Sequence, residues 1–478
     1  MTAASVARYR AGMSSIAAAA PPAATPPPDR LLLWAIVGSQ FGPPFLFSGV
    51  AVALPQMGRE LDLSAVQLGL VETMFLASST AFLLPAGRLA DAGDRRTLFR
   101  WSLMLFALLS AALALVGDAV SVLTLRLLQG AMGALCGATG PAILVELVPP
   151  QQRGRVFGAV LGVVYTGLSA GPLAAGWIVE HLGWRWVFGF GALLVALCYL
   201  PVHARMPSRW RSPGRWVHVP SLVLLVTAVF AMVFGSAAVA NGWSAWLAVG
   251  TGAALLIVFL WLQLRIDAPL LDLRELAHNG VLSRALGVQL LVYGNAYCSI
   301  FLLSVFLQTT KGMAPQDAGL VLAIGSAVMA VVAPFAGRLA DVMRPQVVAG
   351  AGVAAVVLSS ALALGLSADA SAVHVAVVLG AQGLGFGLFS SPNLALIMGS
   401  LGRERSGTAS ALAAQSRGVG MFAGMAVVGV LIALHYGAEP VAAQPARFVG
   451  TLRTAYVVLV VTSGLALAVA VLGRRRAA

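Results

Sequence analysis

Two residues of opposite charge lie deep inside apolar segments of this chain. Glu72 is about six residues inside the apolar run 66–86, and Arg126 is about six residues inside the run 120–147. At about 1.5 Å per helical residue, each charge is roughly 9 Å from the end of its segment. A charge at that depth is costly unless it faces a cavity or a partner. We predict that Glu72 and Arg126 interact and that Glu72 binds a proton; the alternative is that each side chain only reaches the nearer water.

The composition indicates that these two segments are helices in a lipid bilayer. Of the 478 residues, 59% are hydrophobic and 10% are charged, and the mean hydropathy is +0.90. Soluble domains carry roughly 25% charged residues, so an all-α polytopic membrane protein is the expected fold class. Fourteen apolar segments are long enough to cross the membrane: 31–55, 66–86, 98–117, 120–147, 156–179, 185–204, 219–240, 244–264, 285–308, 317–337, 346–367, 373–399, 408–435 and 452–472.

The distribution of basic residues predicts the orientation. The net charge is +13, and most arginines fall in short clusters on alternate sides of the apolar segments. The positive-inside rule then places both termini in the cytoplasm. We expect the protein to lie in the inner (plasma) membrane. Because these clusters lie between apolar runs instead of along one soluble face, they argue against nucleic-acid binding.

A repeated pentapeptide divides the chain. GRLAD occurs at residues 87–91 and again at 337–341, each time after the second apolar segment of a group of six. Repeats placed in this way are typical of transporters, whose substrate site lies between the repeats. We expect four regions: a disordered cytoplasmic tail (1–30), an N-terminal six-helix bundle (31–205), a linker with two extra transmembrane helices (206–280) and a C-terminal six-helix bundle (281–478).

Three motifs resemble the major facilitator superfamily, most closely its fourteen-helix drug:proton antiporter branch. They are GRLADAGDRR (87–96), LRLLQGAMGA (125–134) and GLSAGPLAAG (167–176). The resemblance covers roughly residues 31–473 and implies the major facilitator fold, with two six-helix bundles and two extra central helices. It also implies a gating latch and an antiporter motif. The latch residues would be Gly87, Asp91, Arg95 and Arg96, with Asp341 in the weaker second copy; the antiporter motif would be Gly167, Gly171, Pro172 and Gly176.

Each of these assignments has a simpler alternative. The latch motif is also compatible with a solvated turn that carries topogenic charge, and the antiporter motif with generic close packing of small residues. Transport direction therefore rests on the resemblance. The sequence departs from the branch at one position that concerns proton coupling. The branch usually carries an Asp seven residues before an Ala-Leu-Pro. Here Ala53-Leu54-Pro55 is present, but the position seven residues earlier is Leu46, so proton coupling cannot be assigned to that position.

Polar and aromatic residues inside the apolar segments are candidates for a substrate cavity. An apolar pocket with a few such groups suits lipophilic compounds, including cations. Arg417, deep in the segment 408–435, has two interpretations, as an anchor for backbone carbonyls or as a substrate contact. The cavity candidates are Tyr165, Gln289, Tyr293, Asn295, Tyr297 and Asn393.

These observations predict a proton-coupled secondary active exporter of drugs or other small amphipathic compounds, working by alternating access. We expect no enzyme activity, no cofactor and no metal site, because the sequence shows no catalytic, nucleotide-binding or metal-ligand motif. The expected partners are a small-molecule substrate, protons and the bilayer, and we expect a monomer. Two alternatives stay open: an importer or facilitator of a small metabolite on the same fold, and a membrane sensor that does not transport.

Overall fold

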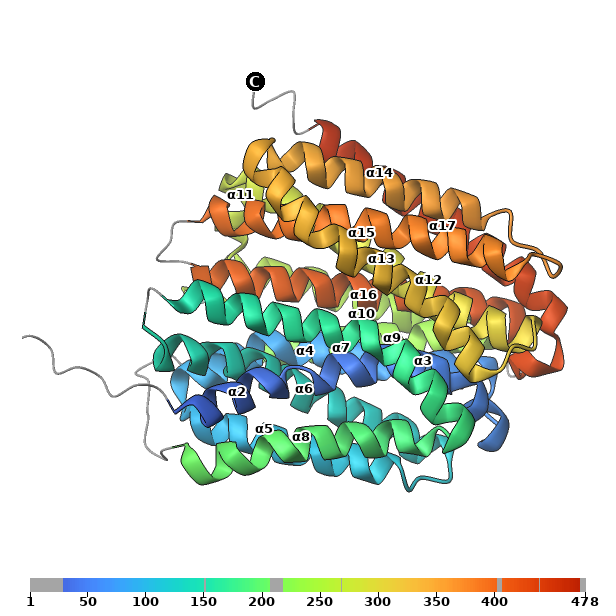
Figure 1. Cartoon of the computed structure of the whole chain (residues 1–478), viewed down its shortest axis with the longest axis horizontal. Helices are drawn as coiled ribbons and strands as arrows, with labels where there is room; N and C mark the ends of the chain where they lie inside the picture. The colour runs from blue at the N-terminus through green and yellow to red at the C-terminus, as the bar shows by residue number, and fades with distance from the viewer. Residues whose placement is uncertain are drawn as a thin grey trace, which may run out of the picture.

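Helices form all of the regular secondary structure in the described part of the chain. The computed structural model describes residues 29–149, 152–206, 218–267, 269–401, 406–437 and 439–472. Fourteen of its helical segments are long and apolar enough to cross a membrane, which agrees with the sequence prediction (Figure 1). Most of the predicted tail 1–30 and of the loop 205–218 lies outside the described residues.

The helices follow the predicted segments closely, with most ends within about three residues of the predicted ones. In chain order they are α2 (Arg30–Ser39), α3 (Gly42–Glu60), α4 (Ala65–Ala92), α5 (Arg95–Leu113), α6 (Ala119–Leu147), α7 (Arg153–His181), α8 (Arg185–Arg205), α9 (Val219–Ala238), α10 (Trp243–Gln263), α11 (Leu273–His278), α12 (Gly280–Val305) with its continuation η3 (Phe306–Thr310), α13 (Pro315–Val342), α14 (Pro345–Ala363), α15 (Ala372–Ser400), α16 (Ser406–Tyr436) and α17 (Pro445–Leu472).

The first membrane span is split into two helices. α2 ends at Ser39 and α3 begins at Gly42, with Pro43 and Pro44 in its first turn. Proline lacks the amide hydrogen that a continuous helix needs but fits well in a first turn, so the helix stops and restarts here. The single segment 31–55 of the sequence prediction is therefore a broken helix that reaches Glu60.

Polar caps fix where several spans begin. The Ser64 hydroxyl accepts from the Gln67 amide, and the Gln67 side chain accepts from the Ser64 amide, so α4 starts with a capping box. The Asp118 carboxylate accepts from the Ser121 hydroxyl and amide at the start of α6, and these hydrogen bonds lower the pKa of Asp118. Such caps hold the helices that carry Glu72 and Arg126 at a fixed register.

The spans form two halves joined along a seam. α2 to α8 lie on one side of Figure 1 in blue and green, and α12 to α17 lie on the other in yellow to red. α3 contacts α12, α4 packs on α16, and α7 packs on α13. α9 contacts both α4 and α16, with α10 packed on α9, so the extra pair covers the seam from one side.

Hydrogen bonds between the halves gather at one end of the bundle. We call the end that carries both GRLAD copies the GRLAD end, and the other the opposite end. At the opposite end the Ala65 amide donates to the Glu439 carbonyl, and the Gln316 amide donates to the Glu180 carboxylate, both at 3.0 Å. Toward the GRLAD end, the polar contacts between the halves among the described residues are Gln415 Nε2 to the Thr80 carbonyl, at 3.2 Å, and the hydroxyls of Tyr165 and Tyr293, 3.4 Å apart. The structure is thus closed at the opposite end.

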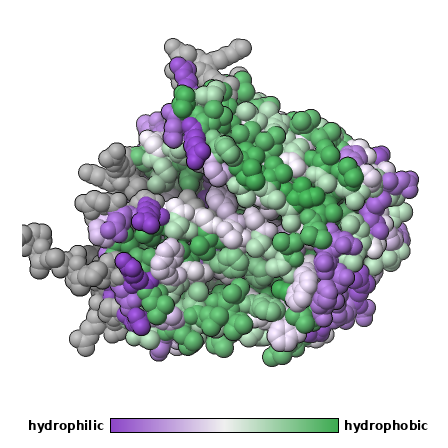
Figure 2. All heavy atoms as spheres, in the orientation of Figure 1, coloured by the Kyte–Doolittle hydropathy of each residue, from purple (hydrophilic) through white to green (hydrophobic). Residues whose placement is uncertain are grey.

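Hydrophobic side chains cover the middle of the outer surface, with hydrophilic atoms at the two ends (Figure 2). Large apolar side chains such as Leu108, Val331 and Val461 are more than half exposed there. A soluble protein rarely exposes so continuous an apolar surface, so this band is the part that faces lipid.

Candidate functional site

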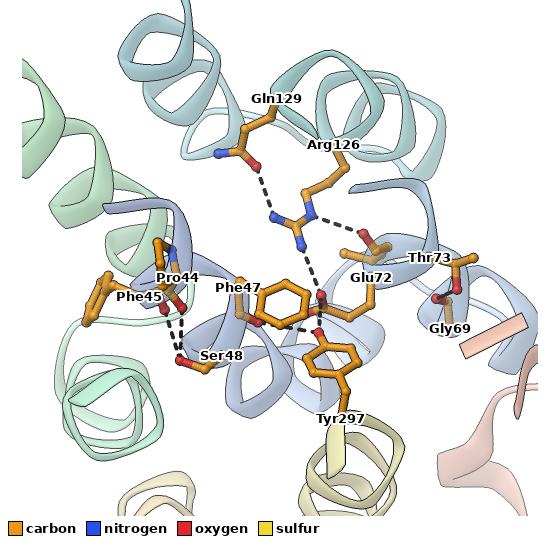
Figure 3. A network of polar contacts seen from close by, with 11 residues as sticks. Pro44, Phe45, Phe47, Ser48, Gly69, Glu72, Thr73, Arg126, Gln129 and Tyr297 are labelled. Carbon is orange, nitrogen blue, oxygen red and sulfur yellow. Dashed lines mark hydrogen bonds and ion pairs between the residues drawn. The ribbon is translucent and has the colours of Figure 1, made fainter. Parts of the chain in front are cut away.

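Glu72, Arg126 and Tyr297 form a buried cluster at the seam between the halves (Figure 3). Arg126 Nη2 lies 3.0 Å from Glu72 Oε2, and both side chains are fully buried. The Tyr297 hydroxyl donates to the same Oε2 atom at 2.6 Å. Glu72 comes from α4, Arg126 from α6 and Tyr297 from α12, so the C-terminal half completes a charge pair that belongs to the N-terminal half.

The surroundings of Arg126 hold its guanidinium in place. Nε donates to the Val71 carbonyl at 3.0 Å, and Nη1 donates to Gln129 Oε1 at 2.9 Å. The guanidinium carbon lies 4.6 Å from the centre of the Phe75 ring, a cation–π contact. Gln129 in turn donates to the Ser110 hydroxyl at 2.8 Å. Each nitrogen of this buried cation donates a hydrogen bond, which offsets the cost of its desolvation.

The carboxylate of Glu72 is less completely satisfied. Its Oε2 atom has two donors, whereas its Oε1 atom is buried and has no hydrogen-bond partner among the described residues. A buried carboxylate oxygen without a donor is energetically unfavourable when the group is ionised. Oε1 is therefore the atom at which this site can take up a proton.

Tyr297 links the cluster to the central cavity. Its ring stacks on Phe47 of α3 at 4.1 Å between centroids, and both residues line a cavity of about 90 Å³ between the halves. Tyr165 and Tyr293 line the same cavity, and their hydroxyls lie 3.4 Å apart. Drug-sized ligands occupy pockets of roughly 300–1,000 Å³, so the cavity must widen to hold one.

Three predicted cavity residues lie elsewhere. Gln289 donates to the Ala413 carbonyl at 2.5 Å, and Asn393 donates to Gln289 Oε1 at 3.2 Å, which ties α12 to α15 and α16. Asn295 donates to the Ser360 hydroxyl at 2.9 Å on the side of α12 that faces α14 and α17. The side-chain amides of these three residues form hydrogen bonds within the C-terminal half and do not line the central cavity.

The glycines of the predicted antiporter motif allow close approach in two directions. A Cβ at Gly167 would lie 2.8 Å from the Phe41 carbonyl, and one at Gly171 would lie 3.0 Å from the Gly49 nitrogen, so both bring α7 onto the α3 side. A Cβ at Gly176 would lie 2.8 Å from the Pro315 carbonyl. This third contact crosses between the halves at the opposite end.

Pro172 takes part in the same crossing. Its carbonyl would lie 2.5 Å from a Cβ at Gly319, on α13. Gly176 and Gly319 therefore face each other where α7 meets α13, and the small residues there set how closely the halves approach.

The predicted latch is built around Arg95. Its Nη2 atom lies 2.5 Å from the Asp91 carboxylate, its Nη1 atom pairs with Glu146, and its Nε donates to the Ala90 carbonyl at 3.0 Å. This guanidinium joins the GRLAD ends of α4, α5 and α6. Sequence reasoning missed Glu146, because an acid at the end of an apolar run resembles any interfacial charge.

The other latch residues differ in their contacts. The Arg96 backbone amide donates to the Asp94 cap of α5 at 3.0 Å, and a Cβ at Gly87 would meet nothing within 4 Å. Asp341, in the second GRLAD copy, is exposed and forms no ion pair with any residue that the structure describes. The two copies occupy equivalent places in the chain, but only the first forms an ion-pair cluster in this state.

Within the described ranges, no group of three or more His, Cys, Asp or Glu side chains is placed to hold a metal ion. Two six-helix halves with a cavity and a buried charge cluster at their seam are the architecture of a membrane transporter built from repeats.

The chain belongs to the Major Facilitator Superfamily, whose family model matches residues 36–274 and 285–478. It is 30% identical over 400 residues to a tetracenomycin C resistance and export protein of Streptomyces glaucescens, covering 81% of this chain and 73% of that protein. It is 28% identical over 397 residues to the multidrug resistance protein Stp of Mycobacterium tuberculosis, covering 80% and 72%. It is 25% identical over 389 residues to a riboflavin transporter of Clostridioides difficile, covering 78% and 82%.

Solved structures show the same fold. A bacterial homolog of the human lysosomal transporter Spinster, in an inward-facing and unoccupied conformation, superposes with a TM-score of 0.65 at 16% identity, covering 93% of this chain and 96% of that one. At that identity the likeness concerns the fold alone. The protein is therefore a multi-pass membrane transporter of this superfamily.

Proposed function

We propose that this protein is a proton-coupled exporter of small amphipathic compounds that works by alternating access. Two relatives, at 30% and 28% identity, are named for resistance, one of them also for export. The two functional units are the regions 31–205 and 281–478, which rock about the central cavity. The GRLAD end faces the cytoplasm because it carries most of the arginines.

The observation that carries this proposal is the arrangement around Glu72. A fully buried carboxylate shares one oxygen between Arg126 and Tyr297, and its other oxygen has no donor among the described residues. Intramembrane carboxylates of this kind are expected at proton relays. Of the 17 acidic residues in the sequence, Glu72 alone lies well inside a membrane-spanning helix.

The geometry suggests how proton and substrate exclude each other. The cavity touches Tyr297 and Phe47 but not Glu72, so a bound compound reaches the carboxylate through the tyrosine. The ionised carboxylate of Glu72 holds the Tyr297 hydroxyl through this hydrogen bond, which keeps the tyrosine turned toward α4 and leaves the cavity to the substrate. When Glu72 takes up a proton, it loses the charge that attracts the hydroxyl, so Tyr297 is released to compete with the substrate for the cavity, and the halves reorient with either the proton or the substrate bound.

The closed opposite end defines the state in which this exchange starts. With the GRLAD end in the cytoplasm, the structure is inward-facing, and contacts such as Gln308 Nε2 to the Val52 carbonyl, at 3.0 Å, seal the outer side. Export requires these contacts to break while the GRLAD end closes. The Arg95 cluster is placed to hold one of the two states.

The test is proton release from inside-out vesicles that contain the purified protein. A panel of lipophilic cations, neutral antibiotics and organic anions is applied to wild type and to Glu72→Gln, with Glu439→Gln, an exposed carboxylate, as the matched control. Release in wild type and in the control, but not in Glu72→Gln, is expected. Unchanged proton stoichiometry in Glu72→Gln would overturn the role of Glu72.

A facilitator of a small metabolite is the second candidate. Leu46 occupies the place where the antiporter branch usually has an acid, and one relative is named a riboflavin transporter. This candidate predicts substrate flux in wild type without any proton movement. A sensor that does not transport predicts neither flux nor proton release.

A further inference from the structure

The cavity between the halves has no charged side chain of either sign in its lining, which includes Tyr165, Tyr293, Gln382 and Phe386. The nearest acid, Glu72, already has Arg126 as its ion-pair partner. A compound in the cavity therefore meets no negatively charged side chain that lacks a cation of its own.

Arg417 lies beside this cavity, over the lining residue Tyr293, although it is not itself one of the lining residues. It lies deep in α16, and its guanidinium carbon is 5.8 Å from the centre of the Tyr293 ring. No described residue forms an ion pair or a hydrogen bond with its side chain. The sequence left two interpretations of Arg417 open, an anchor for backbone carbonyls and a substrate contact. In the described chain, no contact of Arg417 with a backbone carbonyl supports the first.

The helix geometry shows which way Arg417 faces. One side of α16 packs on α4, since Gln415 donates to the Thr80 carbonyl and a Cβ at Gly418 would lie 3.0 Å from the Thr80 hydroxyl. Another side packs on α12, since the Ser416 hydroxyl donates to the Leu286 carbonyl at 2.7 Å.

Arg417 lies between these two sides on the helix surface, as does Met421 one turn further on. Met421 lines the cavity, and Arg417 is partly exposed although Gln415 and Ser416 next to it are buried. The guanidinium therefore stands at the GRLAD side of the cavity, above the ring of Tyr293.

A cation at this depth is costly unless a negative group or water faces it. Guanidinium groups bind planar carboxylates through paired hydrogen bonds, and a cleft with charge of one sign concentrates the oppositely charged ligand. Tyr293 and Phe386 are in edge-to-face contact at 4.7 Å between centroids and provide an aromatic wall beside the cation. An acid with an aromatic body matches both features.

We infer that the transported compound is an organic anion with an aromatic body, whose negative group pairs with Arg417 while the body packs on Tyr293 and Phe386. This inference rests on the proposed function, because it assumes that the central cavity is the transport site. It narrows that proposal. An apolar, aromatic cavity by itself suggests lipophilic cations as substrates, but the positive charge of Arg417 disfavours them.

The test compares three probes that differ in charge and share one ring system: naphthoate, naphthylmethanol and naphthylmethylammonium. Their equilibrium binding to the purified full-length protein in detergent is measured without any ion gradient. We expect naphthoate to bind at least about tenfold more tightly than the ammonium probe, since like charge at a desolvated site is strongly unfavourable. Tighter binding of the ammonium probe, or no measurable binding of naphthoate, overturns the inference.

Variants of Arg417 test whether its guanidinium is the group that binds the carboxylate of naphthoate. Arg417→Gln should weaken naphthoate binding by about tenfold or more and leave naphthylmethanol within about twofold, because only the charged contact is lost. Arg417→Lys should recover part of the naphthoate binding, and Arg453→Gln, an exposed arginine on α17, is the control for net charge. Equal weakening of both probes in Arg417→Gln would mean a structural role and would overturn the assignment. The order of the probes in wild type decides the matter even if Arg417→Gln fails to fold.

The binding test and the proton-release test fail independently. Selective naphthoate binding without substrate-evoked proton release would leave the anion site in place and remove the antiport mechanism. Proton release evoked by cations, together with weak naphthoate binding, would keep antiport and remove the anion site.

Discussion

The hydroxyl of Tyr297, on α12, lies 2.6 Å from Oε2 of Glu72, on α4, so a single hydrogen bond joins the C-terminal half to the buried acid of the N-terminal half. Arg126 contacts the same oxygen from within the N-terminal half at 3.0 Å. Any movement of one half against the other must change this shared contact. The acid is thus placed where its hydrogen bonding depends on the arrangement of the halves.

Tyr297→Phe should reduce substrate-evoked proton release by about tenfold, because a hydrogen bond to a charged group contributes about 1.5–3 kcal/mol. The ring that stacks on Phe47 stays in place, so the cavity wall is retained. Proton release from inside-out vesicles measures the effect. Tyr165→Phe, which removes another cavity hydroxyl without a contact to Glu72, is the matched control and should stay near wild type.

Arg126→Met should destabilise the protein by about 3–5 kcal/mol, because it leaves a buried carboxylate without its cation. Combining it with Glu72→Leu should restore most of that stability, since apolar residues of similar size can replace a buried ion pair. Chemical denaturation in detergent measures both variants. Proton-coupled transport by the stable double variant would show that the pair is structural only.

Gly319→Ala should shift the protein toward a state open at the opposite end. The added methyl group would lie 2.5 Å from the Pro172 carbonyl, and overpacking of this kind costs about 1–3 kcal/mol in the closed state. Spin-label distances between α7 and α13, measured at the opposite end of the bundle, report the shift. Gly287→Ala, where a Cβ meets nothing within 4 Å, is the control. Identical distance distributions in the two variants would contradict the prediction.

Glu146→Gln should slow transport, because it removes one of the two carboxylates that hold Arg95 at the GRLAD end. Partly buried charge pairs of this kind contribute on the order of 1 kcal/mol, so we expect a several-fold change in rate. Asp341→Asn should leave transport close to wild type, since that exposed side chain has no ion-pair partner among the described residues. Initial transport rates in vesicles distinguish the two, and a larger effect at Asp341 would reverse the assignment.

Much of the fold was predictable from the sequence for one physical reason. Hydrocarbon offers no hydrogen bonds to the backbone, so each crossing must be a helix with about 20 apolar residues, and such runs are visible in the sequence. The GRLAD repeat indicated two halves, because the same pentapeptide follows the second apolar segment of each group of six. The break at Gln40 was less visible, because prolines are tolerated inside many membrane helices, as Pro55 is inside α3.

The depth of Glu72 and Arg126 was also fixed by the sequence, because it depends only on their distance from the ends of apolar runs. Which neighbours each polar side chain meets was decided by the tertiary structure. Tyr297 contacts Glu72, Gln289 and Asn393 tie helices together, and Arg95 takes Glu146 as a second partner. A membrane helix that is apolar on all sides carries little information about its own rotation, so packing against neighbouring helices sets which residues face the cavity.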